Sequence, residues 1–232
     1  MSRFCFWHGG GRPRIEFLGY LLQDNSVSPF SSKTFSGVNI GQASPDRELI
    51  FTYFVESTSA YVFGGITVDG SGATIRQSAS NVGGSNVITV GMSHIHFPTG
   101  GPSSVDISFD RNVKSLSIGV YCVYSRNTVG SDNVDYKFAS SGSSSTSAVL
   151  SGIDIQRDGF VVSIFGPRAS ASGLSLSGSP FGLDAIADID SSGSQVPVGM
   201  AHAGVQDESV TGASLTWAWT TARPYVTAAW VF

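Results

Sequence analysis

The stretch Gly41–Glu56, GQASPDRELIFTYFVE, constrains the fold of this chain most strongly, because it predicts a turn that leads into a strand. Pro45 fixes its own φ angle and favours the turn. From Arg47 onwards, side chains alternate between two faces at period two. One face is wholly apolar, while the other mixes Ile50 and Phe54 with polar residues. We therefore expect a central strand with a core on one face and partial cover on the other.

The rest of the chain repeats this rhythm of short alternating strands and turns. Asp69-Gly70, Asp110-Arg111-Asn112 and Arg223-Pro224 are the expected turns between neighbouring strands. No helix longer than a turn or two is expected, and a chain with 28 glycines and only 13% charged residues suits tight turns. The predicted fold class is all-β, an antiparallel two-sheet sandwich that is jelly-roll-like. Strands are expected at residues 15–22, 34–40, 47–56, 66–68, 73–77, 87–97, 105–109, 116–122, 153–155, 160–164, 174–176, 183–189, 196–203, 215–219 and 226–232.

Two segments set the expected domain organisation. Residues 1–14 contain three consecutive glycines and a proline, which predicts a flexible N-terminal arm. Residues 139–148, ASSGSSSTSA, predict a flexible loop. We expect residues 15–232 to form a single β-sandwich domain that contains this Ser-rich loop. The alternative is two β domains that divide near residue 145.

The arm carries the predicted interface. Phe4, Phe6 and Trp7 precede the glycines, and exposed aromatic side chains on a flexible segment are costly unless something covers them. They either fold back on their own domain or dock on a neighbouring subunit. Together with Arg12 and Arg14, they are the expected interface residues.

Charge and hydropathy exclude several classes of partner. A net charge of −4 gives no electrostatic case for nucleic acid, which requires a basic field. No apolar run approaches the roughly 20 residues of a membrane helix. The first residues lack the apolar core of a signal peptide, so we expect the protein to be made in the cytosol and either kept there or built there into something larger.

The two cysteines are too few for a disulfide scaffold. Cys122 lies on the apolar face of an expected strand and is predicted to be a buried free thiol. Cys5 lies in the arm. A bond from Cys5 to Cys122, or to another subunit, requires an oxidising compartment.

His94-Ile95-His96 is the best chemical candidate, because two histidines at i and i+2 on one strand face can reach one metal ion. A further ligand is still needed, and Asp106, His202 or His8 are the options. A cupin-type jelly roll has a glutamate shortly after the HxH pair, and none follows in this chain. The preferred interpretation puts both histidines on the outward face, solvated or at an interface. The alternative is that they are packed and hydrogen-bonded.

Asp184, Asp188 and Asp190 are expected to share one strand face, where clustered carboxylates can bind calcium. Calcium-loop spacing is missing, so a solvated face that protects a sheet edge is preferred. The sequence also lacks a GxSxG motif, CxxC spacing and any phosphate loop between a strand and a helix. No catalytic residue and no cofactor are therefore expected.

Aromatic residues near the end of the chain raise the possibility of a sugar-stacking platform. Trp217 and Trp219 share the face of Leu215, which favours a place in the core. Trp230 and Tyr225 fall on opposite faces of the expected strand, so this pattern predicts that Tyr225 is the more exposed of the two. A carbohydrate-binding role depends on exposed tryptophans.

Three segments resemble a group of uncharacterised phage and prophage proteins of alphaproteobacteria. The similarity covers about residues 30–125 and follows a rhythm of turns and strands. The chain ends, as those proteins do, in a strand of small residues and tryptophan, TAAWVF. The segments are TFSGVNIGQASPDRELIFTYFV, GGITVDGSGATI and SHIHFPTGGPSSVDISFDRNVKSLSIGVYCV.

The resemblance implies a non-enzymatic virion component of the head-decorating, spike or fibre, or tail accessory type. Its implied partners are major capsid or tail subunits and further copies of itself, with a trimer as one arrangement. No catalytic residues carry over, and the similar proteins have aromatic residues at the positions of His94 and His96. The alternatives are a carbohydrate-binding or host-attachment module and a cupin-like metal-dependent enzyme that uses these two histidines.

Overall fold

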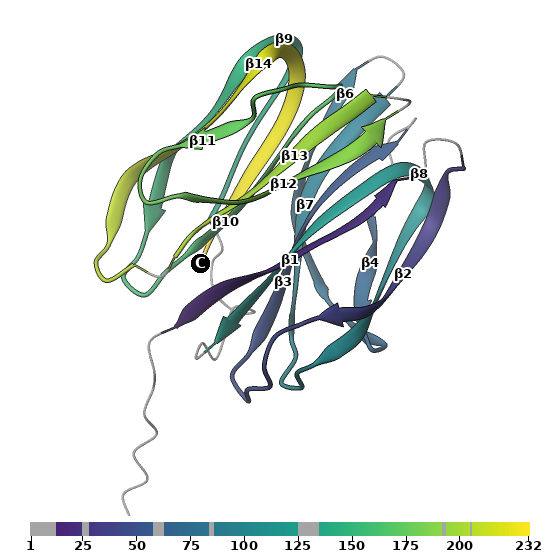
Figure 1. Cartoon of the computed structure of the whole chain (residues 1–232). Helices are drawn as coiled ribbons and strands as arrows, with labels where there is room; N and C mark the ends of the chain where they lie inside the picture. The colour runs from purple at the N-terminus through teal and green to yellow at the C-terminus, as the bar shows by residue number, and fades with distance from the viewer. Residues whose placement is uncertain are drawn as a thin grey trace, which may run out of the picture.

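The computed structural model describes residues 13–24, 28–57, 63–83, 86–124, 135–191, 194–204 and 206–232. Within these ranges the chain is all-β, with two antiparallel sheets and no helix, as the sequence predicts. None of the described residues forms a helix long and apolar enough to cross a membrane. Both sheets bend strongly and pack against each other (Figure 1).

The first sheet, sheet A, is built around its longest strand. Its order is β5-β4-β8-β3-β7-β6, and β1 and β2 also pair with β8. Four strands therefore border β8. The strands of sheet A are β1 (Arg14–Asp24), β2 (Phe30–Asn39), β3 (Glu48–Ser57), β4 (Phe63–Val68), β5 (Ser71–Gly72), β6 (Thr74–Gly83), β7 (Asn86–His96) and β8 (Pro102–Tyr124).

The second sheet, sheet B, has the order β11-β14-β10-β13-β12, and β9 pairs with β14. Its two longest strands, β9 and β14, form a ribbon that bends over the sheet (Figure 1). The strands of sheet B are β9 (Asp135–Ile155), β10 (Val161–Pro167), β11 (Ser175–Ser177), β12 (Gly182–Ser191), β13 (Ser194–Ala203) and β14 (Val210–Val231).

Two expected turns are wrong, because the strands continue through them. Residues 110–112 lie inside β8, and residues 223–224 lie inside β14. Along β8, β2 and β4 pair with its first half, and β1 and β3 pair with its second half. Pairs on both sides of residues 110–112 carry β8 through its bend: Phe30 pairs with Val113, and Ser32 pairs with Ser108 across a register shift. On β14, register shifts around Arg223 produce the bend without ending the strand.

The predicted loop at residues 139–148 is also wrong, because this segment lies within β9 and pairs with β14. Serine and threonine suit a strand that faces solvent. The hydroxyl oxygens of Ser141 and Ser145 accept N–H bonds from residues two positions further on, which fits a strand that bends. Residue 145 is inside this strand. The last strand of sheet A ends at Tyr124, and the first strand of sheet B begins at Asp135.

The apolar interior has three layers. The core of sheet A lies within the bend of that sheet, the middle core lies between the sheets, and the core of sheet B lies within the second bend. All ten residues of β3 are buried. Phe51 faces the core of sheet A, while Ile50 and Phe54 face the middle core. The prediction of a central strand covered on both faces is confirmed, and the cover is more complete than expected.

Candidate functional site

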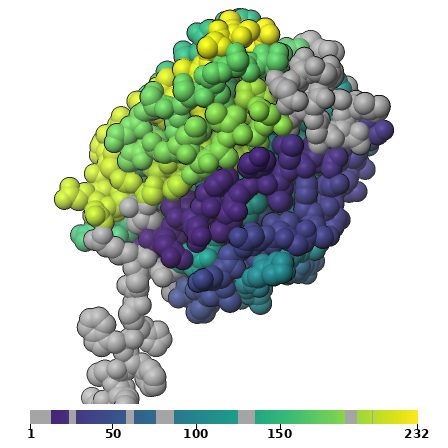
Figure 2. All heavy atoms as spheres, in the orientation of Figure 1, coloured from purple at the N-terminus to yellow at the C-terminus, as the bar shows by residue number. Residues whose placement is uncertain are grey.

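A groove with a volume of about 490 Å³ lies between β1 and β2. Residues 18–23 of β1 and 33–39 of β2 form its two sides, and Val120 of β8 contributes to its floor. In Figure 2, β1 (purple) crosses the visible face between sheet B (green and yellow) and the rest of sheet A (blue). We call this feature the β1–β2 groove.

Both strands that border the groove are paired on one side. Across the described residues, β8 is the hydrogen-bonded strand neighbour of β1 and also of β2, and neither has a second one. The other edge of each strand therefore presents backbone N–H and C=O groups, which form a template for another strand. The groove brings two such edges together.

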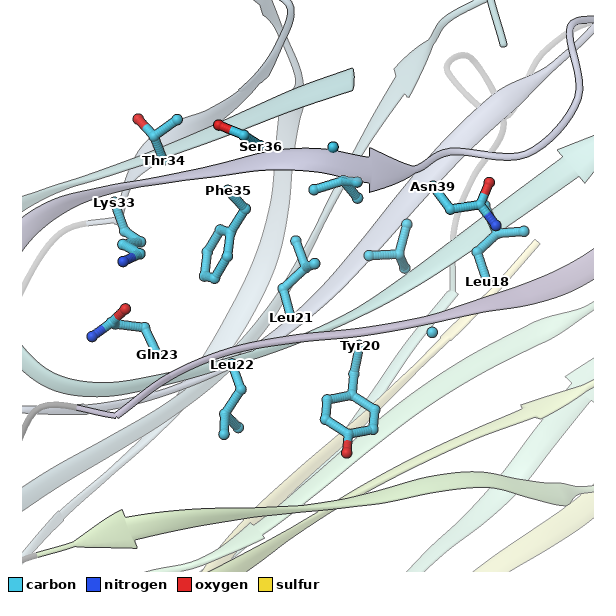
Figure 3. A pocket seen from close by; sticks show the side chains of 14 residues that line it. Leu18, Tyr20, Leu21, Leu22, Gln23, Lys33, Thr34, Phe35, Ser36 and Asn39 are labelled. Carbon is cyan, nitrogen blue, oxygen red and sulfur yellow. The ribbon is translucent and has the colours of Figure 1, made fainter. Parts of the chain in front are cut away.

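The groove has apolar side chains along its middle and polar side chains toward its ends, with Lys33 and Gln23 at one end and Asn39 at the other (Figure 3). Leu21 of β1 and Phe35 of β2 point into the space between the strands, whereas Tyr20 and Ser36 point away from it (Figure 3). Leu18, Leu21 and Phe35 pack against the core of sheet A. A side chain that enters the groove therefore reaches the hydrophobic core directly.

Bulges shape both sides of the groove. The register of β1 shifts between Phe17 and Gly19, so that Phe17 faces the middle core and Leu18 faces the core of sheet A. The register of β2 shifts between Phe35 and Val38, where Gly37 has a φ of 69°. Such bulges increase the local twist and bend a strand. They place the irregular part of each edge at the groove.

Arg14, one of the predicted interface residues, lies at one end of the groove and is the first residue of β1 rather than the last of an arm. Its guanidinium carbon is 4.5 Å from the ring centre of Tyr124, and one of its nitrogens is 3.7 Å from a carboxylate oxygen of Glu16. The Tyr124 hydroxyl accepts the backbone N–H of Gln42 at 3.0 Å. The other predicted interface residues, Phe4, Phe6, Trp7 and Arg12, lie outside the described residues.

Arg47 joins the two turns next to this end of the groove. Its buried guanidinium donates hydrogen bonds to the main-chain oxygens of Ile40 and Gln42 at 2.8 Å and of Phe97 at 2.8 Å, and it also donates to the oxygen of Thr99. These hydrogen bonds to four main-chain carbonyls hold the two turns together.

The two histidines of the HxH motif have different environments. His94 is 4% exposed, and its Nδ1 lies 3.2 Å from Oε2 of Glu48, whose side chain is 5% exposed. His96 is exposed. The expected outward position is therefore wrong for His94, which lies on β7 between β3 and β6 and is buried beside Glu48. The alternative of a packed, hydrogen-bonded histidine is confirmed for His94.

The candidate third ligands do not join these histidines. Asp106 accepts a hydrogen bond from Thr34 Oγ1 at 2.5 Å, and His202 contacts Asp184. His8 lies outside the described residues. Among the residues that the structure describes, no three His, Cys, Asp or Glu side chains lie close enough together to hold a metal ion.

A polar cluster links the two sheets. The Tyr121 hydroxyl of sheet A donates to Oδ2 of Asp184 at 2.9 Å, and Oδ1 of Asp184 lies 2.6 Å from Nδ1 of His202. Burial, followed by the charge and the hydrogen bond of Asp184, raises the pKa of Tyr121, which therefore keeps its proton and acts as the donor. This cluster fixes sheet B against β8.

Asp184 reaches that cluster because β12 has a bulge between Leu183 and Ala185. The bulge turns Asp184 inward, while Asp188 stays exposed. The expected shared face is therefore wrong for Asp184, and the side chain of Asp190 lies outside the described residues. No local signal could reveal this contact, because Tyr121 is 63 positions away.

The tryptophans are confirmed as core residues. Trp217 and Trp219 belong to the core of sheet B, and Trp230 belongs to the middle core. Tyr225 is half-buried, with its ring centre 5.5 Å from that of Trp219. These residues leave no tryptophan face free for sugar stacking. Cys122 is a buried free thiol, as predicted.

No protein-family model, no curated protein and no solved structure matches this chain.

Proposed function

We propose that the protein is a non-enzymatic structural component of a bacteriophage particle, of the head-decorating or spike- or fibre-associated type. It binds other subunits by accepting an extended segment in the β1–β2 groove. Its partners are major capsid or tail subunits, and it is assembled into the virion in the host cytoplasm. In this proposal the two bent sheets form a jelly-roll-like sandwich that serves as a scaffold for the groove.

One observation carries the proposal. Two strand edges border a groove whose middle is apolar and opens onto the core of sheet A. Strand addition satisfies the backbone of such edges, and alternate side chains fill the groove. Each large apolar side chain that becomes fully buried there contributes about 1.5–3 kcal/mol. Repetition on a symmetric particle multiplies such contacts through avidity.

The two alternatives have less support. A carbohydrate-binding or host-attachment module would use exposed tryptophans, whereas Trp217, Trp219 and Trp230 are buried. A cupin-like enzyme would bring His94 and His96 to one metal ion, whereas His94 contacts Glu48 and His96 faces solvent. The sequence resemblance to phage and prophage proteins favours the structural role over both.

The proposal predicts that groove variants fail to join the particle. Phe35→Asp places a charge in the groove, and Ser36→Pro removes a backbone donor where β2 is not in register with β8. We expect both variants to show an occupancy at least about tenfold lower than that of the wild type in purified particles. The loss of one apolar contact of about 1.5–3 kcal/mol weakens binding by at least that factor. Quantitative mass spectrometry of particles made by the encoding genome measures the occupancy.

Val149→Asp is the matched control, because Val149 is an exposed apolar residue of β9 in sheet B. We expect it to join particles as the wild type does. Thermal unfolding of each purified variant shows whether it is folded before assembly. Full occupancy of the two groove variants, or absence of the wild-type protein from particles, would contradict the proposal.

A further inference from the structure

We infer that the segment that fills the β1–β2 groove is residues 2–8 of a second copy of this chain, so that copies assemble by exchanging N-terminal strands. This inference rests on the strand-accepting role proposed for the groove and names its partner. The sequence pattern of the segment, the length and chemistry of the groove, and the position of the segment in the chain support it.

The segment has the pattern of a strand. In SRFCFWH, Phe4 and Phe6 fall on one face at period two, and Cys5 and Trp7 fall on the other. Its seven residues match the groove, which is six residues long on β1 and seven on β2. A strand of this length therefore spans the groove once.

The groove chemistry suits these side chains. Leu18, Leu21 and Phe35 offer apolar contacts in the interior, which Phe4 and Phe6 can fill from a strand added to either edge. Large alternating apolar side chains with main-chain hydrogen bonds are the usual ligand of a strand-accepting groove.

The position of the segment favours a second copy over the same chain. Residues 9–13, GGGRP, join the segment to β1, and hairpin loops commonly have two to five residues. A five-residue loop at residues 9–13 would place Trp7 beside Ile15 and Phe4 beside Leu18. Phe6 and Trp7 would then lie before the groove, and only Phe4 would reach its first residue, Leu18. The segment of another copy has no such limit, and exchange of an identical element builds oligomers at low cost.

A disulfide experiment tests the inference. With Phe4 and Phe6 in the groove, Cys5 faces the same side as Ser36, which points away from the interior (Figure 3). We expect Ser36→Cys to form a Cys5-to-residue-36 disulfide between two chains on mild oxidation. Non-reducing denaturing electrophoresis separates linked chains from single chains, and peptide mapping identifies the bond. Cys122 is buried and does not compete.

The control is Ser151→Cys, on the exposed side of β9. We expect at least about tenfold less linkage there, because residue 151 lacks the high effective concentration of a docked segment. A disulfide within one chain would show that the segment docks on its own groove and would overturn the exchange. Equal linkage at residues 36 and 151, or no linkage, would also overturn it.

The oligomeric state gives a second test. Phe4→Asp with Phe6→Asp is expected to raise the dissociation constant of the oligomer at least about 100-fold, because two apolar anchors are lost. Ser2→Asp with Gly10→Asp adds the same charge and keeps both aromatic residues, so it should assemble as the wild type does. Light scattering across a concentration series measures the mass. A monomeric wild type, or an unchanged Phe4/Phe6 variant, would overturn the inference.

The exchange and the structural role can fail separately. A monomeric wild type that still joins particles would overturn the exchange and leave the role proposed above. An exchanged oligomer that is absent from particles would support the exchange and contradict that role.

Discussion

Replacing Arg47 with methionine is expected to lower the free energy of unfolding by about 3–5 kcal/mol. The substitution keeps much of the side-chain volume but removes the donors to four main-chain carbonyl groups. A buried acceptor that loses its partner costs about 1–3 kcal/mol, and relief of the buried charge offsets part of the sum. Urea unfolding followed by circular dichroism measures the loss.

The turns that Arg47 joins leave little room for compensation. A Cβ atom at Gly100 would lie 2.2 Å from the backbone nitrogen of Ala43, so the two turns touch through their main chains. Arg111→Met is the matched control, since Arg111 is exposed and forms an ion pair with the carboxylate of its neighbour Asp110. It should change the free energy by no more than about 0.5 kcal/mol. Similar losses for both variants would contradict the role assigned to Arg47.

The two histidines of the HxH motif should respond very differently to alanine. His94→Ala is expected to lower the free energy of unfolding by about 2–4 kcal/mol, because it removes one partner of the buried Glu48 carboxylate and leaves a cavity. His96→Ala should cost no more than about 0.5 kcal/mol, because His96 is exposed. Urea unfolding of the two variants allows the comparison.

The same pair separates a structural histidine from a metal site. We expect Zn²⁺ and a chelator to leave the melting temperature of the wild type and of both variants unchanged. A cupin-like site would instead show Zn²⁺-dependent stabilisation of the wild type that both variants lose. That pattern would contradict a purely structural role for His94.

Local sequence patterns predicted those features that depend on residues a few positions away in the sequence. The alternation in β3 identified a strand covered on two faces, and Asp69-Gly70 identified a tight turn, where both residues have positive φ angles of 47° and 82°. Parity alone placed Trp217 and Trp219 in the core. In each case the signal lies within a few residues of the feature.

Features that depend on distant pairing were missed. Residues 110–112 and 139–148 have turn or loop composition. Residues 110–112 nevertheless continue β8 between two paired stretches, and 139–148 lie in β9, which pairs with β14. The bulge at Asp184 changes the face that a simple alternation assigns. The groove itself arises because, among the described strands, β1 and β2 each pair with β8 alone, and no residue type in the sequence predicts that pairing.

Hydrogen exchange of the backbone amides in residues 18–23 and 33–39 tests the central claim most directly. The claim is that these strand edges accept another strand in the assembled particle. Amides that become paired are expected to exchange at least about 100-fold more slowly in particles than in the isolated Phe4→Asp/Phe6→Asp chain. Residues 175–177 of the edge strand β11 serve as the internal reference and should not change. Equal exchange of the groove amides in the particle and in the isolated chain would contradict strand addition at the groove.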